Sequence, residues 1–467
     1  MKETSLDIIM AKSEVSQLDK IRLVLTMSLP AILAQLTSIA MQYIDAGMVG
    51  SLGAGATAAI GLMSSSTWLV GGSCIGIAAG FYVQVAHLVG AKRLHDAEDV
   101  LRQGIKAALL TGIAIACICA LISPVLPVWL GGEEEIISDA SAYFFIYSLS
   151  IPFDMIRQLS CGMMQSTGDM KTPSILASLI CVLDVILNFF MIFPSRVLQT
   201  AGHSMTIPGA GLGVTGAAIA TALSQVIISL IALYMITVMN NKISLLNKGS
   251  WRWKKKTVLT AARIGIPLSL DQIFICSAYV AGTLIVAKLG TVPVAANSLA
   301  ITAESLCYMP GYGIGAAATA IIGQSIGAKR YDLTRSFARV SVALGMILMG
   351  LMGVLMYISA PTVFSVLTSS SEVAELGTRV LRIELFAEPM YGAAICCAGV
   401  FRGAGDTLRP SIMNLVSMWC VRIVPAMFLV PVMGLNGYWI VMAGELCFRG
   451  VIFLIRMRRG KWLRSVL

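Results

Sequence analysis

Charged side chains are scarce in this chain of 467 residues, since Asp, Glu, Lys and Arg together make up only 12% of it. A water-soluble domain usually carries about 25% charged residues, so this chain has too few to cover a surface that faces water. Histidine is also rare, and the spacing of His87, His95 and His203 matches no metal-binding motif. We therefore expect neither a soluble enzyme nor a histidine-based metal centre.

Cysteine is present in 11 copies, but none stands in a polar loop beside a partner. Each lies within or at the edge of an apolar segment, as Cys117, Cys119, Cys396 and Cys397 do. We interpret them as small core residues and not as disulfides or metal ligands. The polar first 22 residues do not resemble a cleaved signal peptide. No cofactor is expected.

Apolar residues make up 57% of the chain, and its mean hydropathy is +0.83. A helix needs about 20 apolar residues to cross the hydrocarbon core of a membrane, and the sequence contains twelve such segments. They lie at about 23–47, 56–86, 104–130, 137–165, 172–193, 211–239, 258–287, 294–323, 336–361, 375–401, 411–431 and 435–456. These segments are too long for barrel strands, so the sequence predicts an all-α integral membrane protein.

Basic residues are unevenly distributed between the two sides of these segments. If the N-terminus is cytoplasmic, 27 of the 34 Lys and Arg residues fall on the cytoplasmic side. Cytoplasmic loops retain Lys and Arg, so both termini are expected inside the cell. The net charge of +10 is thus a sign of topology, and no nucleic-acid partner is needed to explain it.

The sequence repeats itself at an offset of 237 residues, as between Gly90 of "VGAKRL" and Gly327 of "IGAKRY". "GDMKTPS" at 168–174 and "GDTLRPS" at 405–411 share this offset. We expect the two glycines to permit a tight exit from a helix. Since each half holds six spans, we predict parallel lobes related by an axis along the membrane normal. The expected domains are a cytoplasmic N-terminal segment (1–22), an N-lobe (23–239), a cytoplasmic linker (240–256), a C-lobe (257–456) and a basic tail (457–467).

Four stretches resemble the multidrug and toxic compound extrusion (MATE) transporters. They are "SLPAILAQLTSIAMQYIDAGMVGSLG" (28–53), "ESLCYMPGYGIGAAATAIIGQSIGAKR" (304–330), "STGDMKTPS" (166–174) and "FRGAGDTLRPS" (401–411). The chain is most similar to the DNA-damage-inducible branch found in prokaryotes. The resemblance implies two six-helix lobes in a V around a central cavity that opens alternately to each side. It also implies export of organic, often cationic compounds against inward Na⁺ or H⁺.

Acidic residues inside the first six spans are candidates for binding the coupling ion, because an ionisable group in a span is costly and marks a functional site by default. Asp45 is the only charged side chain between Arg22 and His87, and Asp184 and Asn188 share one face of the fifth span. With Thr221 nearby, two carboxylates could hold either a proton or a hard cation such as Na⁺. The resemblance assigns Asp45 and Thr221 to family positions, but the usual Asn-then-Asp order of the fifth helix is reversed here.

The second lobe has its own polar residues in spans. The family position of a seventh-helix glutamate is occupied by Ile275, whereas Asp271 and Gln272 resemble the acid–Gln pair of the nearer branch. Glu304 is expected at the cavity or the lobe interface, and Glu384 and Glu388 on one face of the tenth span, where they would meet a cationic substrate or pair with Arg422. The substrate-cavity candidates are Gln42, Tyr43, Asp271, Gln272, Glu304, Glu384, Glu388 and Arg422. Asp154 and Arg157 are interpreted as a structural ion pair.

The function that these observations favour is a monomeric antiporter of the prokaryotic cytoplasmic membrane, which exports small organic molecules in exchange for H⁺ or Na⁺. A lipid-linked oligosaccharide flippase of the same superfamily is the alternative, but it would need a more basic cavity. A facilitator-type porter is disfavoured because "GAKRLHDAED" does not match its first inner turn. A membrane-embedded enzyme is disfavoured because no metal set, phosphate loop or nucleophile–base pair is visible.

Overall fold

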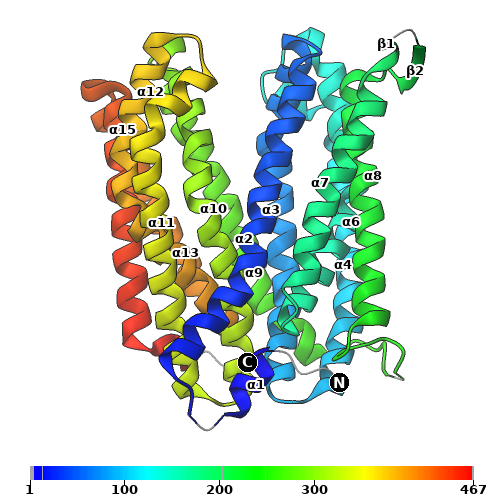
Figure 1. Ribbon diagram of the computed structural model, residues 1–467, viewed down its shortest axis with the longest axis vertical. Helices are drawn as coiled ribbons and strands as arrows, with labels where there is room; N and C mark the ends of the chain where they lie inside the picture. The colour runs from blue at the N-terminus through cyan, green and yellow to red at the C-terminus, as the bar shows by residue number, and fades with distance from the viewer. Residues whose placement is uncertain (1–4, 13, 201–202, 248, 465–467) are drawn as a thin grey trace.

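The computed structural model describes residues 5–12, 14–200, 203–247 and 249–464. These residues form two helical bundles that stand side by side and diverge toward one end, where a short hairpin projects (Figure 1). Both chain termini lie at the opposite end (Figure 1). The short helix α1 (Ser5–Ala11) packs against the second bundle, where Leu6 shares a core cluster with Ile326 and Phe337. The first bundle contains α2 (Gln17–Gly50), α3 (Ala54–Gly90), α4 (Leu94–Ile122), α5 (Leu126–Trp129), α6 (Glu134–Ser166), α7 (Lys171–Ile192), α8 (Gly213–Tyr234) and the π-helical turn η1 (Met235–Met239).

The second bundle repeats this order. It contains α9 (Lys255–Ala287), α10 (Thr291–Gly327), α11 (Tyr331–Leu367), α12 (Ser371–Glu384), the 3₁₀ turn η2 (Leu385–Ala387), α13 (Glu388–Gly403), α14 (Leu408–Val416), the π-helical turn η3 (Ser417–Ile423), α15 (Val424–Arg459) and η4 (Lys461–Arg464). α3 and α10 begin and end at positions that share the 237-residue offset. The antiparallel strands β1 (Pro194–Thr200) and β2 (His203–Ala210) have no counterpart in the second bundle, among the described residues.

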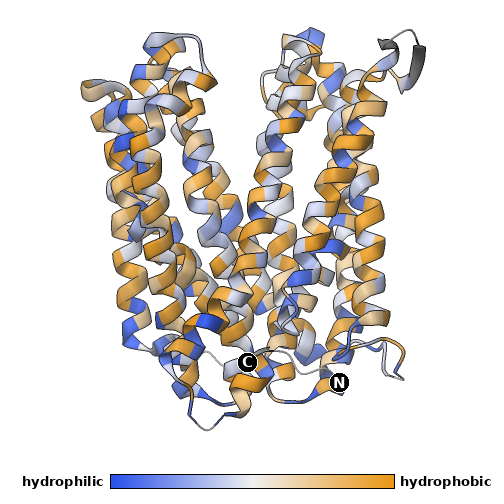
Figure 2. Ribbon diagram, viewed as in Figure 1, coloured by the Kyte–Doolittle hydropathy of each residue, from blue (hydrophilic) through white to orange (hydrophobic). Residues whose placement is uncertain are grey.

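Eleven helical segments of the described chain are long and apolar enough to cross a membrane. The last, Leu408–Arg459, is 52 residues long and bends at Gly434, which adopts φ 59° and ψ −142°. It therefore holds the eleventh and the twelfth predicted spans, and the all-helical membrane fold expected from the sequence is confirmed. Hydrophobic residues occupy most of the length of the helices, and hydrophilic residues gather at both ends (Figure 2).

The tenth span is not the continuous helix that its apolar pattern predicted. It is interrupted by the 3₁₀ turn Leu385–Ala387, and α13 then begins with Glu388 and Pro389. Proline has no N–H to donate and its ring clashes with the preceding turn, so an α-helix cannot run through Pro389 undisturbed. Glu384 and Glu388 consequently lie on either side of a break.

The glycines of the two GAKR turns have a different role from the expected one. In these two turns the residues with positive φ are the lysines Lys92 and Lys329, each with φ 59°. Gly90 and Gly327 are instead required by the contact between α3 and α10. A Cβ atom on Gly90 would lie 2.0 Å from the carbonyl oxygen of Gln324, and one on Gly327 would lie 2.0 Å from that of His87. The repeated glycine thus brings the two lobes together.

The lobes meet through two equivalent helix pairs, α3 with α9 and α2 with α10. Small residues allow close approach: a Cβ on Gly76 would lie 2.5 Å from Ser269 Oγ, and one on Gly313 would lie 2.6 Å from Ile32 N. The Ser269 hydroxyl also donates to the carbonyl oxygen of Ser73 at 2.9 Å. Small residues at helix crossings are typical of membrane bundles, and here they line the interface between the lobes.

Candidate cation-coupling site

Two carboxylates and one amide come together where α2 meets α7. Asn188 Nδ2 donates to Asp45 Oδ1 at 2.9 Å and to Asp184 Oδ2 at 3.0 Å. Asp184 and Asn188 are one turn apart on α7 and are completely buried, whereas Asp45 on α2 is partly exposed. A single amide therefore bridges a partly exposed carboxylate and a completely buried one.

Hydroxyl groups of α8 complete this site. Ser224 Oγ lies 3.5 Å from Asp184 Oδ1, and Thr221, one turn earlier, is also within reach of the Asp184 carboxylate. Thr221 also lines a small cavity with Tyr143 and Tyr147 of α6. Thr221 was expected here from the sequence and Ser224 was not, although a spacing of three residues places both on one helical face.

One oxygen of this site is left without a partner. Asn188 Oδ1 is buried and accepts no hydrogen bond in the part of the chain that the structure describes. A buried acceptor without a donor is costly, and a bound cation would relieve that cost. The Asp45 and Asp184 carboxylates and the Ser224 hydroxyl bring oxygen ligands together at this site, and oxygen ligands suit a hard cation or a proton.

The equivalent place in the second lobe cannot hold such a site. At the repeat offset Asp45 corresponds to Gly282 and Asp184 to Val421. A Cβ atom on Gly282 would lie 2.2 Å from the Tyr438 hydroxyl, so no carboxylate fits there without rearrangement. Among the described residues, no group of three or more His, Cys, Asp or Glu side chains is placed to hold a metal ion.

The residues predicted to line a substrate cavity lie in several separate places. Asp271 on α9 accepts a hydrogen bond from Asn414 Nδ2 at 3.0 Å, while its other oxygen is buried without a partner among the described residues. Gln272 packs on α3 at Gly72, so it lies in the lobe interface. In the first lobe, Gln42 is exposed, and Tyr43 donates from its hydroxyl to the Thr302 carbonyl of α10 at 3.1 Å.

Arg422 pairs with a residue that the sequence analysis did not consider. Its guanidinium donates to Glu445 Oε2 at 2.6 and 3.1 Å, and Arg449 contacts the same carboxylate at 2.6 Å. Ser417 donates to it as well. The π-helical turn η3 shifts the register of α14 by adding a residue to the turn, and Arg422 lies within it. The expected alternative, a pair between Arg422 and Glu384 or Glu388, is therefore wrong.

Glu304, Glu384 and Glu388 are removed from solvent. Glu304 is 6% exposed and the other two are completely buried. All four carboxyl oxygens of Glu384 and Glu388 are without a hydrogen-bond partner among the described residues. They do not face an open cavity in this conformation. In the first lobe Asp154 accepts from Arg157 Nε at 3.0 Å and also binds Gln158, which is the arrangement of a structural ion pair.

A family model described as MatE matches residues 30–190 and 267–428. A probable multidrug resistance protein NorM of Thermotoga maritima is 25% identical over 454 residues, covering 97% of this chain and 94% of that protein. A probable multidrug resistance protein YoeA of Bacillus subtilis is 24% identical over 402 residues, covering 84% and 83%.

Solved structures support the same fold. An outward-facing multidrug resistance MATE family transporter of the MOP superfamily matches with a TM-score of 0.89 at 18% identity, covering 100% of this chain and 99% of the other. A MOP superfamily transporter from Pyrococcus furiosus, described as having a binding pocket of reverse polarity, matches with a TM-score of 0.88 at 18% identity over 98% of both chains.

Proposed function

This chain belongs to the MatE family and is a multi-pass membrane transporter rather than an enzyme, and from that premise we propose that it exports organic, cationic or amphipathic compounds in exchange for inward H⁺ or Na⁺. The observation that carries the exchange is the Asp45–Asn188–Asp184 arrangement. Two carboxylates held by one neutral amide have excess negative charge, and a charge in the membrane interior needs a partner. A cation or a proton supplies it.

Exchange then follows from the geometry of this site. Asp45 is partly exposed and Asp184 is completely buried, so an ion would reach Asp45 first, and Asp184 would share it once the Asn188 amide moves aside. Loading changes the charge between α2 and α7, and a ligand shifts a conformational equilibrium only through its different affinity for the two states. Cargo and cation would therefore compete by favouring different conformations of the same lobe.

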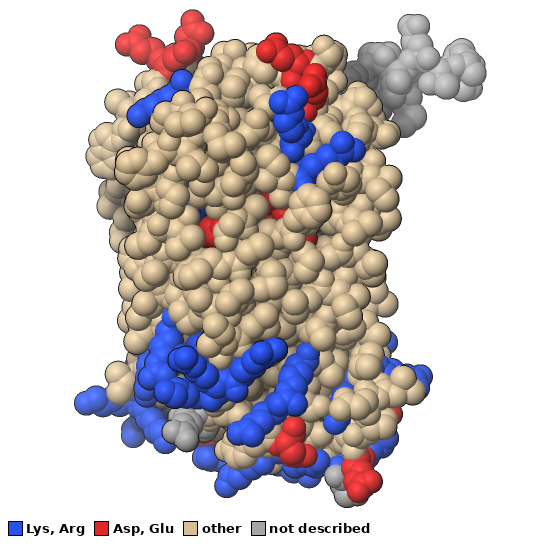
Figure 3. All heavy atoms as spheres, turned by 90° about the vertical axis from the view of Figure 1, so that its left-hand side faces the viewer, with Lys and Arg blue, Asp and Glu red and all other residues tan. Residues whose placement is uncertain are grey.

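Surface charge supports an orientation for the proposed transport. Lys and Arg form a dense band at the end that carries the chain termini, whereas the other end shows a few acidic and basic side chains together (Figure 3). Basic residues are retained on the cytoplasmic side. We therefore assign both termini to the cytoplasm of a prokaryotic cell and the hairpin to its exterior, with the monomer as the transporting unit.

A matched pair of hydrogen bonds closes the proposed cytoplasmic end. His87 Nε2 of α3 donates to the Gly403 carbonyl oxygen at 2.7 Å, and Gln324 Nε2 of α10 donates to the Ser166 carbonyl oxygen at 2.7 Å. His87 and Gln324 are separated by the repeat offset, and so are Ser166 and Gly403. Each lobe thus holds the other by the same contact, and an inward-open state must break both.

Replacing Gln324 with leucine should favour opening at this end. A hydrogen bond contributes about 1 kcal/mol, so the ratio of open to closed states should rise about fivefold. Hydrogen exchange should become faster at the cytoplasmic ends of α3 and α10. Ser174→Ala is the control, because that hydroxyl bonds only within its own helix. Equal exchange in both variants would argue against the closure.

The second-lobe candidates are proposed as cargo residues in the alternate conformation. Asp271 and Gln272 support assignment to the DNA-damage-inducible branch, whereas Ile275 replaces the seventh-helix glutamate of others. The flippase alternative gains no support, since the span residues Arg157, Arg422 and Arg449 are all paired with carboxylates. Among the described residues, these three arginines therefore offer no unpaired guanidinium to a pyrophosphate.

Efflux from vesicles tests the proposed exchange. Purified protein in liposomes should extrude a cationic dye when either a Na⁺ or a H⁺ gradient is imposed in the direction of the proposed ion flow. The cation that drives efflux is the coupling ion, and collapsing its gradient with an ionophore should stop uphill movement. Dye efflux at the same rate with and without either gradient would refute antiport, even if the dye still binds.

A further inference from the structure

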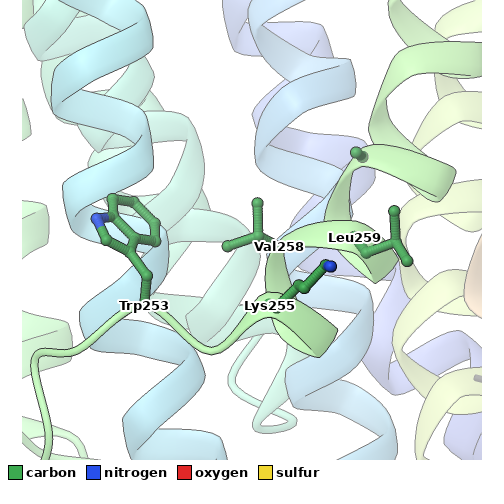
Figure 4. A pocket seen from close by; sticks show the side chains of 5 residues that line it. Trp253, Lys255, Val258 and Leu259 are labelled. Atoms are coloured by element: carbon green, nitrogen blue, oxygen red, sulfur yellow. The ribbon is translucent and has the colours of Figure 1, made fainter.

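An apolar groove lies where the linker enters the second lobe. It has a volume of about 500 Å³ and is lined by Trp253, Lys255, Val258, Leu259 and Ala262. Trp253 stands on one side, Leu259 on the other, and Val258 and Lys255 lie between them (Figure 4). Leu259 is 66% exposed and Trp253 is 47% exposed. An apolar surface of this kind indicates a ligand with an apolar part.

The groove is at the depth of a lipid headgroup. Lys255 is the first residue of α9, which is one of the membrane-spanning segments. The groove therefore begins at the basic end of the molecule and continues along the first apolar turns of the helix. Tryptophan is enriched at this level of a membrane because its ring is apolar and its N–H is polar. The apolar part of the ligand would point toward the bilayer centre.

The charge around the groove selects an anionic headgroup. Lys255 and Lys256 are exposed and have no ion-pair partner in the described part of the chain, whereas Lys254 binds Asp99 at 2.6 Å. The first turn of α9 contains no acidic residue. The positive end of the helix dipole adds to the two free ammonium groups. Basic residues near the membrane surface attract acidic lipids.

The linker that forms one wall is fastened to the first lobe. Arg102 Nη2 donates to the Asn247 carbonyl, and the Lys254 N–H donates to Gln103 Oε1 at 2.9 Å. Lys106 bonds the Trp251 carbonyl and lies 5.2 Å from the ring centre of Trp253. The other wall, α9, belongs to the second lobe. The first turns of α9 also contact the first lobe, since Gln84 Nε2 of α3 donates to the Thr257 carbonyl at 3.1 Å. The groove thus lies at the junction of the linker, α9 and the first lobe.

We propose that this groove binds one anionic phospholipid of the cytoplasmic leaflet, with its phosphate at Lys255 and Lys256 and an acyl chain along Val258, Leu259 and Ala262. A lipid that contacts both walls stabilises the relative position of linker and α9 in which the groove exists. Because linkage is reciprocal, anionic lipid then adjusts the balance between transporter conformations. The site itself does not depend on the identity of the cargo or the coupling ion.

Lipid retention by the purified full-length chain tests the site. Native mass spectrometry should show one phosphatidylglycerol retained in preference to phosphatidylcholine. Lys255→Gln with Lys256→Gln should lower that retention by about fivefold for each lysine. Lys171→Gln is the matched control, because Lys171 is an exposed lysine that also opens a helix on the same side but lines no such groove. Equal retention of the two lipids, or equal losses in variant and control, would overturn the proposal.

A second variant separates the groove from general attraction to charge. Ala262→Phe fills the groove and leaves every lysine in place, so it should release the lipid as the lysine variant does. Glycerol phosphate, which has the headgroup chemistry without the chains, should not displace the lipid at equal concentration. Retention that survives Ala262→Phe, or displacement by glycerol phosphate, would show that no acyl-chain site exists. Thermal unfolding of each variant identifies any loss caused by misfolding.

Discussion

Asp45→Asn should strongly reduce uphill export while leaving the protein folded. The substitution keeps the size of the side chain and the hydrogen-bonding capacity toward Asn188, but removes the partly exposed charge of the site. Coupling free energies between two ligands are typically 1–3 kcal/mol, or about 5- to 150-fold, and we expect a loss within that range. Gradient-driven dye efflux from proteoliposomes measures it. Asp139→Asn, an exposed carboxylate in α6 at the same end of the molecule, should export normally.

Exchanging the two α7 residues sharpens this test. Asp184→Asn and Asn188→Asp singly change the number of carboxylates, whereas the double exchange keeps one carboxylate and one amide on the same helical face. If coupling depends on the number of carboxylates and amides on this face, each single variant should lose uphill export. The double variant should then recover much of that activity. Uphill export at the normal rate by Asp45→Asn, or by both single variants, would refute the coupling role.

Glu445→Ala should produce the largest loss of stability of any single substitution considered. The carboxylate binds both Arg422 and Arg449, is completely buried, and also accepts from Ser417. Removing it leaves two cations uncompensated in the second lobe. Breaking one buried pair costs about 3–5 kcal/mol, so thermal unfolding in detergent should occur at a clearly lower temperature.

The matched control is Glu375→Ala, which also breaks a carboxylate–arginine pair. Its partner Arg379 is one helical turn away, and the two side chains are 75% and 58% exposed. An exposed pair contributes only about 0.2–1 kcal/mol, so the unfolding temperature should scarcely change. Similar stability in the two variants would mean that water or a rearranged partner compensates the arginines.

Hydropathy predicted the membrane fold because the bilayer requires about 20 apolar residues for each crossing. The same scarcity of charge singled out Asp45 and Asp184, which the structure brings together through Asn188. The turn at η2 was missed because its residues are as apolar as those of a helix. Only the position of Pro389 indicated the break.

The Arg422–Glu445–Arg449 cluster could not be predicted in the same way. Arg449 and Glu445 are four residues apart on one helix, but Arg422 is 23 residues before Glu445 and is separated from it by the bend at Gly434. The direction of the Arg422 side chain depends on the π-helical turn η3. No periodic pattern in the sequence indicates that turn. Local spacing therefore fixed which residues share a helix face, and the tertiary fold decided which faces meet.

Gly282 stands where the first lobe has Asp45, and the Tyr438 hydroxyl occupies the space a side chain would need. The two halves of the repeat thus differ at this position. On our proposal that the first lobe binds the coupling ion, that half can keep its ion chemistry constant while the other accumulates changes that suit new cargo. Under drug selection, we expect altered specificity to arise mainly through substitutions after residue 256, without loss of the energy source for transport.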